Sequence, residues 1–175
     1  MIEFNTEKLD YKGVYVLKDF LDKSLSIFQK EWALVTAGTM DNYNTMTIGW
    51  GGFGTLWRKP VCTVYVKPCR YTHSFMDANE YFTVSFYSEE YRDALAVLGT
   101  KSGRDGDKVA EVGFTAVTAG ESVTFAQSKT TIVCKKIYRQ DMVLDTMPAE
   151  AIEKYYTEEE PHTVFVGEVV EIIGE

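Results

Sequence analysis

The chain has little of what metal sites and disulfide frameworks need, since its 175 residues include only two histidines and three cysteines. No H-E-x-x-H motif, C-x-x-C pair or cysteine cluster joins them, so the sequence predicts no metal site. The odd set of cysteines, Cys62, Cys69 and Cys134, argues against paired disulfides. Free thiols are typical of a reducing compartment, and we therefore expect a cytoplasmic protein.

Long apolar runs and an excess of positive charge are missing as well. No run approaches membrane-spanning length, and the start "MIEFNTEKLDYKG" lacks the basic-then-apolar pattern of a signal peptide. Eighteen Lys and Arg against 26 Asp and Glu leave a net charge of -8. Such a surface repels phosphate backbones and anionic lipid, so neither nucleic acid nor a membrane is the expected partner. An anionic ligand would need a local basic pocket.

Aromatic residues, in contrast, are abundant at 14%, and they favour strands. Alternating or continuous apolar patterns predict strands at 32–39, 45–50, 61–67, 81–87, 113–118, 131–139 and 163–173. Helices are expected at 18–29, 88–100 and 148–156, with a shorter one near 72–74 and a turn at 41–44. Strands outnumber helices and follow one another through short connections. The sequence therefore predicts a single domain over 1–175, mainly β and antiparallel, as a barrel or sandwich with peripheral helices.

The segment "TIGWGGFGTLW" has glycines at the spacing of a dinucleotide-binding turn, G-x-G-x-x-G. No crossover helix can follow it, because Pro60 and then an alternating strand come next, so this is not a Rossmann loop. Glycines within a strand mark either a sharp bend or a close approach by another backbone or a ligand, and both interpretations stay open. Trp50 and Trp57 flank the run, so a planar ring could lie against bare backbone. Core packing explains either tryptophan equally well.

The stretch "KPCRYTHSFM" could hold an anion at the start of a short helix. The guanidinium of Arg70 suits a phosphate, the hydroxyls of Thr72 and Ser74 add donors, and the helix start contributes N–H groups. A plain helix cap with a solvated arginine is the alternative. Cys69 is interpreted as a small packed residue, although Arg70 beside it could lower the pKa of an exposed thiol.

A second basic loop, "GTKSGRDGDK", holds Lys101, Ser102, Arg104 and Lys108. It does not fit a Walker motif. It is either a mobile surface loop or a flap whose cations close over an anionic ligand. Together with the glycine segment, the two basic loops predict a flat, phosphorylated ligand.

Five segments in order, "NTMTIGWGGFGTLWRKP", "VYVKPCRYTHSFM", "YFTVSFY", "GTKSGRDGDKV" and "PHTVFVGEVVE", resemble the flavin reductase-like family of FMN-binding split barrels. The family includes flavoredoxins and NAD(P)H:flavin oxidoreductases, and the resemblance runs from about residue 32 to 172. It implies a six-stranded antiparallel Greek-key split β-barrel with peripheral helices. It also implies a homodimer with FMN near the interface.

The resemblance assigns roles by matching position. Contacts to the ring system and ribityl chain are expected from Thr45, Met46, Thr47, Trp50 and Gly51. Contacts to the phosphate are expected from Arg70, Thr72 and Ser74, with Tyr71 and His73 close by, and further contacts from Lys101, Ser102, Gly103 and Lys108. His162 falls where the family places a histidine near the nicotinamide site. The sequence departs from the family there, since many of its reductases carry Gly-Asp-His and this chain has Glu160, Pro161 and His162.

Three functions follow from the resemblance. The first is a flavin reductase that transfers hydride from NADH or NADPH to FMN. The second is a flavoredoxin-like carrier that keeps FMN bound and passes electrons between partner proteins. The third is a split barrel that binds another ligand, such as haem. In the first two, FMN carries the chemistry, and the protein holds it, tunes it and presents a donor.

Overall fold

The computed structural model describes residues 23–158 and 160–174. Residues 23–31 are helical, which confirms the described part of the helix expected at 18–29, while residues 18–22 of that prediction lie outside the described residues. The assignment of the whole chain, 1–175, to one domain stays a prediction. No helix within the described ranges is long and apolar enough to cross a membrane.

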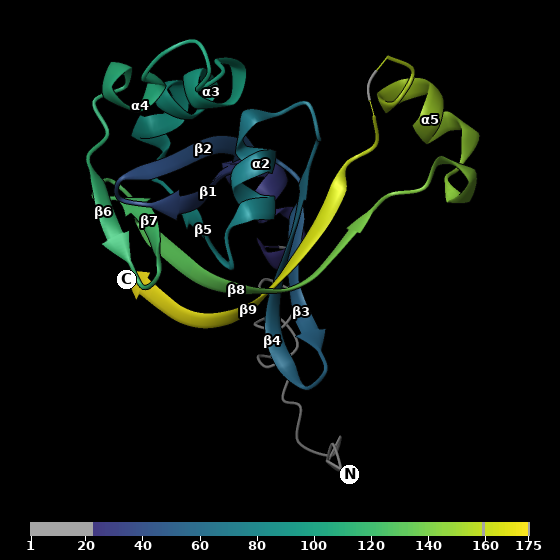
Figure 1. Cartoon of the computed structure of the whole chain (residues 1–175), viewed down its shortest axis with the longest axis horizontal. Helices are drawn as coiled ribbons and strands as arrows, with labels where there is room; N and C mark the ends of the chain where they lie inside the picture. Colours follow the sequence, from purple (N-terminus) through teal and green to yellow (C-terminus); the bar gives the residue numbers. More distant parts are fainter. Residues whose placement is uncertain (1–22, 159, 175) are drawn as a thin grey trace, which may run out of the picture.

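A seven-stranded antiparallel sheet organises the described chain (Figure 1), in the order β2-β1-β5-β8-β9-β4-β3. Its strands are β1 (Ala33–Thr39), β2 (Asn42–Ile48), β3 (Gly51–Leu56), β4 (Lys59–Val66), β5 (Tyr81–Phe86), β8 (Thr130–Asp141) and β9 (Thr163–Gly174). A separate hairpin pairs β6 (Ala116–Ala119) with β7 (Ser122–Phe125). β1 lies beside β5 in the sheet, and β4 lies beside β9, although neither pair is consecutive in the chain. Such long connections between neighbouring strands are typical of Greek-key topology.

The mainly β, antiparallel prediction is confirmed, with two differences in detail. The sheet has seven strands and is not closed, whereas the family resemblance implied six. The additional strand is β3, which the glycine run had hidden, and it pairs with β4 through a two-residue turn. Trp57 and Arg58 form that turn at positive φ angles of 52° and 63°, the geometry that matches the twist of a hairpin. β7 was also missed, because four residues are too few to show alternation.

Helices cover one end of the sheet and one side of it. They are α2 (Tyr71–Ala78), α3 (Arg92–Thr100), α4 (Lys108–Glu111) and α5 (Ala149–Tyr155). α2 packs on β1 and β2, and α3 packs on β2, because each turns its buried apolar residues toward the sheet. α5 stands apart on the segment that links β8 to β9 (Figure 1). The predicted helices at 88–100 and 148–156 are thus confirmed, the first with a 3-10 turn at Glu89–Tyr91.

The glycines of the central run have different environments. A Cβ on Gly51 would lie 2.6 Å from Cε1 of Phe28. The buried Phe28 ring also packs against Phe53 and Phe86, with 5.4 Å between ring centroids in both pairs. A Cβ on Gly52 or Gly54 would meet nothing within 4 Å. The close approach at Gly51 is made by a core side chain, and not by the backbone or ligand that the glycine pattern suggested.

The three cysteines are free. Cys62 and Cys134 are buried, and a hydrogen bond with Cys62 together with burial raises the pKa of the Cys134 thiol. Cys69 is exposed, so its interpretation as a packed residue was wrong. It lies in the turn between β4 and α2, where the chain runs over the surface.

Candidate functional site

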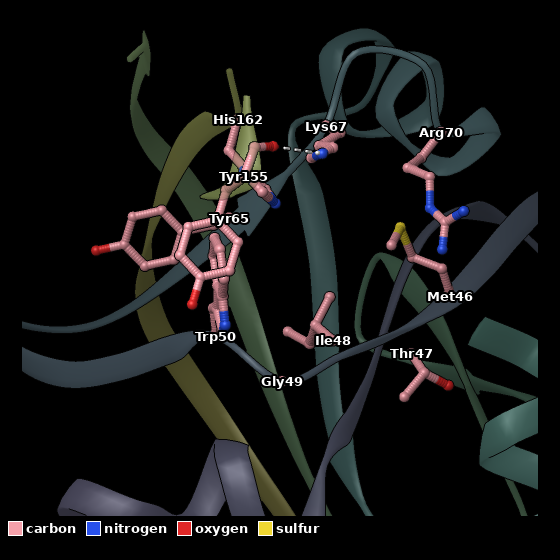
Figure 2. A pocket seen from close by; sticks show the side chains of 10 residues that line it. All are labelled: Met46, Thr47, Ile48, Gly49, Trp50, Tyr65, Lys67, Arg70, Tyr155 and His162. Atoms are coloured by element: carbon pink, nitrogen blue, oxygen red, sulfur yellow. Dashed lines mark hydrogen bonds between the residues drawn. The ribbon is translucent and has the colours of Figure 1, made fainter. Parts of the chain in front are cut away.

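A cavity of about 400 Å³ opens beside β2, at the end where the chain turns toward β3 (Figure 2). One wall is the main chain from Met46 to Trp50. Its full lining is Met46, Thr47, Ile48, Gly49, Trp50, Tyr65, Lys67, Arg70, Tyr155 and His162. The volume lies within the range of about 300–1,000 Å³ that small-molecule sites occupy.

One end of the large cavity is aromatic. The Trp50 and His162 rings lie 4.7 Å apart at 38°, and Tyr155 meets Trp50 edge to face at 5.3 Å. Figure 2 shows Tyr65 gathered with them, and Lys67 Nζ donating to the Tyr155 carbonyl at 3.3 Å. These side chains come from three separate parts of the chain, namely the β2–β3 link, the end of β4 and the segment between β8 and β9, so this end forms only in the folded chain.

His162 reaches this end from the segment between β8 and β9. The Met142 amide donates to the His162 carbonyl at 3.0 Å, so the segment leaves and rejoins the sheet at adjacent positions. Tyr156 Oη lies 3.0 Å from His162 Nδ1 and fixes the ring. Burial raises the pKa of the Tyr156 phenol, so the hydroxyl keeps its proton at neutral pH.

A smaller cavity of about 130 Å³ adjoins the first, between the start of α2 and the loop that follows α3. Met46 and Arg70 line both cavities. The rest of its lining is Asn44, Cys69, Tyr71, Thr72, Gly99, Thr100, Lys101, Ser102, Gly103, Arg104 and Lys108. With Arg70, four side chains of the whole lining are cationic and none is a carboxylate, although the chain as a whole carries -8. The small cavity is therefore the local basic pocket that an anionic ligand requires.

Hydrogen bonds to main-chain carbonyls hold three of the four cations of the small cavity, and the fourth, Lys101, pairs with Glu111 at 2.5 Å. Arg70 Nη2 donates to Gly99 O at 2.5 Å, and Arg104 Nη1 donates to Cys69 O at 3.2 Å. Lys108 is buried, and its Nζ donates to Leu98 O at 2.7 Å and to Lys101 O at 2.9 Å.

The charge of Lys108 responds to this environment. Burial, with a smaller contribution from the nearby Arg70 charge, lowers the pKa of Lys108 to about 8. An ammonium has three donors, and the two carbonyls use two of them. One N–H therefore remains for an anion in the cavity.

The structure brings most of the predicted site residues to the two cavities. The large cavity takes Met46, Thr47, Trp50, Arg70 and His162, and the small one takes Met46, Arg70, Tyr71, Thr72, Lys101, Ser102, Gly103 and Lys108. Two hydroxyls already have partners, since Thr47 donates to Leu95 O and Thr72 accepts from Asn44 Nδ2.

Three predicted residues lie outside both linings. Thr45 is buried and its hydroxyl bonds within the sheet, to Thr36 Oγ1 at 2.8 Å and Val35 O at 3.1 Å. Ser74 is exposed on α2 and donates to Tyr71 O at 2.8 Å. Gly51 faces Phe28. Their roles in binding stay predictions. Trp57, the second flanking indole, is 64% exposed at the hairpin turn and is not part of either lining.

Sequence reasoning missed several lining residues. Tyr65 and Lys67 lie at the end of a strand that was predicted, but nothing in the pattern shows which face is next to β2. Tyr155 comes from a helix that was expected without a role. Arg104 was noted as part of the basic loop but was not predicted to line the site. Its positive charge beside glycines was the sequence signal that could have indicated it.

His73 was expected near the phosphate. It is a residue of α2, and its side chain belongs to a separate hydrogen-bond network. Its Nε2 lies 2.8 Å from Thr163 Oγ1, and its Nδ1 lies 3.4 Å from Asp77. Burial lowers the pKa of His73, while Asp77 opposes that shift. Within residues 23–158 and 160–174, no group of histidines, cysteines and carboxylates is placed to hold a metal ion.

The antiparallel sheet thus carries a cavity of about 400 Å³ with an adjoining basic pocket. Residues 25–175 match the model of the flavin reductase like domain, and the chain belongs to that family. No curated protein sequence matches the chain.

Solved structures share the fold. Flavoredoxin from Methanosarcina acetivorans superimposes with a TM-score of 0.67 at 18% identity, over 83% of this chain and 68% of that one. The FMN-binding protein from Thermus thermophilus, with bound 1-cyclohex-2-enone, superimposes with a TM-score of 0.65 at 19% identity, over 82% of this chain and 70% of that one. Flavoredoxin of Desulfovibrio vulgaris (Miyazaki F) superimposes with a TM-score of 0.64 at 22% identity, over 82% of this chain and 69% of that one.

Proposed function

We propose that this protein binds FMN and reduces it with hydride from NADH or NADPH. The observation that carries the proposal is the junction of the two cavities at Met46 and Arg70. A ring-sized space and a cationic, carboxylate-free pocket share a wall, as a flat phosphorylated ligand needs. Membership in the flavin reductase like family and the names of the structural neighbours support flavin as that ligand.

The residues present fit FMN. Arg70, Lys108 and the loop that contains Ser102 would hold the phosphate through charge-assisted hydrogen bonds. The segment from Met46 to Trp50 would hold the ring system in the large cavity. When bound, FMN supplies the two-electron chemistry, and the protein excludes water, orients the ring and stabilises charge.

The aromatic end is the proposed docking place of the nicotinamide donor. Trp50, Tyr155 and His162 offer ring faces and edges to a second flat group, which suits stacking. The residues need only hold donor and acceptor at about 3–3.5 Å, and no side chain has to act as a nucleophile. His162, fixed by Tyr156, is the residue proposed to contact the donor.

The main alternative is a flavoredoxin-like carrier, which the names of two structural neighbours favour. A carrier would keep FMN and exchange electrons with a partner protein. Anaerobic mixing of the purified, yellow protein with NADH and with NADPH separates the two functions. Rapid bleaching of the flavin band supports the reductase, and bleaching only by a reduced protein donor supports the carrier. A protein that shows no flavin absorbance band after purification, and none after flavin is added, would support the third function, binding of a non-flavin ligand.

The quaternary and cellular proposals follow the family resemblance. A homodimer is proposed, and the exposed Phe53 and Trp57 on the β3–β4 hairpin are apolar surface available to a second copy. Light scattering on the purified protein tests the dimer. A cytoplasmic location is proposed from the three free cysteines and is tested by fractionation.

Arg70→Ala tests the phosphate assignment. We expect FMN affinity to fall at least about 30-fold, because a charge-assisted hydrogen bond is worth about 1.5–3 kcal/mol and Arg70 can make more than one. Lys129→Ala removes the same charge from an exposed position outside both cavities and is the matched control. Equal FMN affinity in Arg70→Ala and Lys129→Ala would remove the assignment.

A further inference from the structure

The base of the segment between β8 and β9 carries a network of five polar side chains: His73, Asp77, Arg139, Asp141 and Thr163. We infer that this network, through the hydroxyl of Thr163, positions the ring of His162 for the nicotinamide donor. The inference rests on the proposed reductase function and adds to it a set of positioning residues. None of the five belongs to the lining of either cavity, so they act through His162.

The network lies where the segment leaves and rejoins the sheet (Figure 1). Asp141 is the last residue of β8, and Thr163 is the first residue of β9 and pairs with it across the ladder. His162, which lines the large cavity, comes directly before Thr163 in the chain. Because adjacent residues share a rigid peptide plane, the direction in which His162 leaves the sheet depends on how Thr163 is held.

The Thr163 side chain is buried between two polar partners. Its hydroxyl donates to Asp141 Oδ1 at 2.6 Å. Because a hydroxyl has one proton, its oxygen accepts from His73 Nε2, which lies 2.8 Å away. The hydrogen bond from Thr163, with the charge of Arg139, lowers the pKa of Asp141, so this carboxylate is an ionised acceptor at neutral pH. Partners on two sides hold Thr163 in one rotamer.

Further contacts brace these two partners. Arg139 donates through its two Nη atoms to Asp141, at 2.9 and 3.1 Å, and through Nε to Asp77 at 3.1 Å. Asp77 Oδ2 in turn lies 3.4 Å from His73 Nδ1. The network thus begins and ends on α2, with side chains from β8 and β9 between. Its outer ion pairs are exposed, and such pairs contribute little, so the buried hydrogen bonds of Thr163 carry the effect.

Two separate sets of contacts hold His162. Within the segment, Tyr156 Oη lies 3.0 Å from its Nδ1. At the sheet, the network holds the residue that follows it, and the Met142 amide donates to its carbonyl at 3.0 Å. The ring then lies 4.7 Å from the Trp50 ring, at the aromatic end of the large cavity. Loss of the Thr163 hydrogen bonds is therefore expected to displace the His162 ring and to leave the basic pocket unchanged.

The imidazole signals of the apoprotein test the inference without flavin. The chain has two histidines, so His73→Leu leaves His162 as the only one. In ¹H–¹⁵N NMR spectra we expect the His162 signal to shift and broaden in His73→Leu and in Thr163→Val. His73→Gln keeps an N–H donor near the position of Nε2, and Thr163→Ser keeps the hydroxyl, so both should preserve the wild-type signal. Thr118→Val, on exposed β6, is the control.

Stopped-flow reduction of the FMN-loaded protein gives the second measurement. We expect Thr163→Val to raise the KM for the nicotinamide donor about three- to tenfold, as loss of about one hydrogen bond would. The FMN dissociation constant should stay constant, and Thr163→Ser should keep the wild-type KM. In a His162→Ala background, Thr163→Val should change the KM no further, because the ring that it positions is gone. A threonine with only a structural role would not show this dependence on His162.

The outcomes separate the inference from the proposed function. A His162 signal that is unchanged in both His73→Leu and Thr163→Val would overturn the inference while leaving the reductase in place. Equal effects of Thr163→Val on the KM with and without the His162 ring would also overturn it. If neither NADH nor NADPH bleaches the flavin of wild type, the proposed function fails and the donor role fails with it. The NMR comparison then still decides whether Thr163 positions His162.

Discussion

Tyr156 Oη lies 3.0 Å from His162 Nδ1, within the segment that links β8 to β9. Because burial raises the pKa of this phenol, the hydroxyl stays protonated at neutral pH. The contact holds the direction of the His162 ring, which lines the aromatic end of the large cavity.

Tyr156→Phe tests this pairing. Loss of one hydrogen bond of about 0.5–1.5 kcal/mol frees the His162 ring, so we expect the KM for the nicotinamide donor to rise about two- to tenfold. FMN affinity is expected to stay constant, because Tyr156 is in neither lining. Stopped-flow reduction at several donor concentrations gives the measurement, with Tyr138→Phe as a control on exposed β8. Unchanged kinetics in Tyr156→Phe would show that the orientation of His162 does not matter for the donor.

Lys108 gives a pH-dependent prediction. Burial lowers its pKa from 10.5 to about 8, with a contribution from Arg70, so between these two values the unfolded chain binds more protons than the folded chain. The contribution of Lys108 to the free energy of unfolding therefore rises as pH increases from about 8 to 10.5.

Urea unfolding of the apoprotein and of Lys108→Met at pH 7 and pH 9.5 measures the effect of that shift. The stability of wild type relative to the variant should increase with pH, and other groups cancel in the difference. Lys129→Met, which changes an exposed lysine, is the control and should give the same difference at both values. A difference that is flat or falls with pH for Lys108→Met would contradict the assigned shift.

Gly51 and Gly52 form a matched pair on β3. A Cβ at Gly51 would lie 2.6 Å from the buried Phe28 ring, whereas one at Gly52 would meet nothing within 4 Å. We expect Gly51→Ala to lower the free energy of unfolding by about 1–3 kcal/mol through overpacking, and Gly52→Ala to change it far less. Chemical denaturation of both variants gives the comparison. Equal stabilities would mean that Phe28 moves aside at little cost.

Thr163 links the carboxylate of Asp141 to the imidazole of His73 on α2. Its hydroxyl donates to Asp141 Oδ1 at 2.6 Å and therefore accepts from His73 Nε2 at 2.8 Å. Thr163→Val removes both contacts and leaves the buried imidazole N–H without a partner, so we expect a loss of about 1–3 kcal/mol in unfolding free energy. Thr118→Val, on the exposed side of β6, is the control. A loss no larger than that of the control would argue that water replaces the hydroxyl.

The sequence predicted the sheet well where side chains alternate, as in β4 and β5, because the period of two is a local property. It did not show β3, since glycines carry no pattern, nor which of the glycines is constrained. That constraint at Gly51 comes from Phe28, a residue 23 positions earlier in the chain.

The candidate site was predictable where charge collects within a loop and where the family resemblance supplied positions, as for Arg70 and Lys108. Residues that enter from distant elements could not be found this way. Tyr65 and Tyr155 approach the large cavity through the pairing of β4 with β9 and the path of the segment after β8. Both are consequences of tertiary register, which no local pattern encodes.

The segment from Met142 to His162 leaves the sheet just after Asp141 and returns at Thr163, and these two residues are paired across the ladder. The segment therefore starts and ends at neighbouring positions of the sheet. We expect that the length and composition of this segment can change, or that the segment can be replaced by mutagenesis, while the basic pocket at Arg70 and Lys108 keeps its shape. His162, the residue proposed to contact the donor, and the residues proposed to hold the phosphate therefore lie on separate parts of the chain.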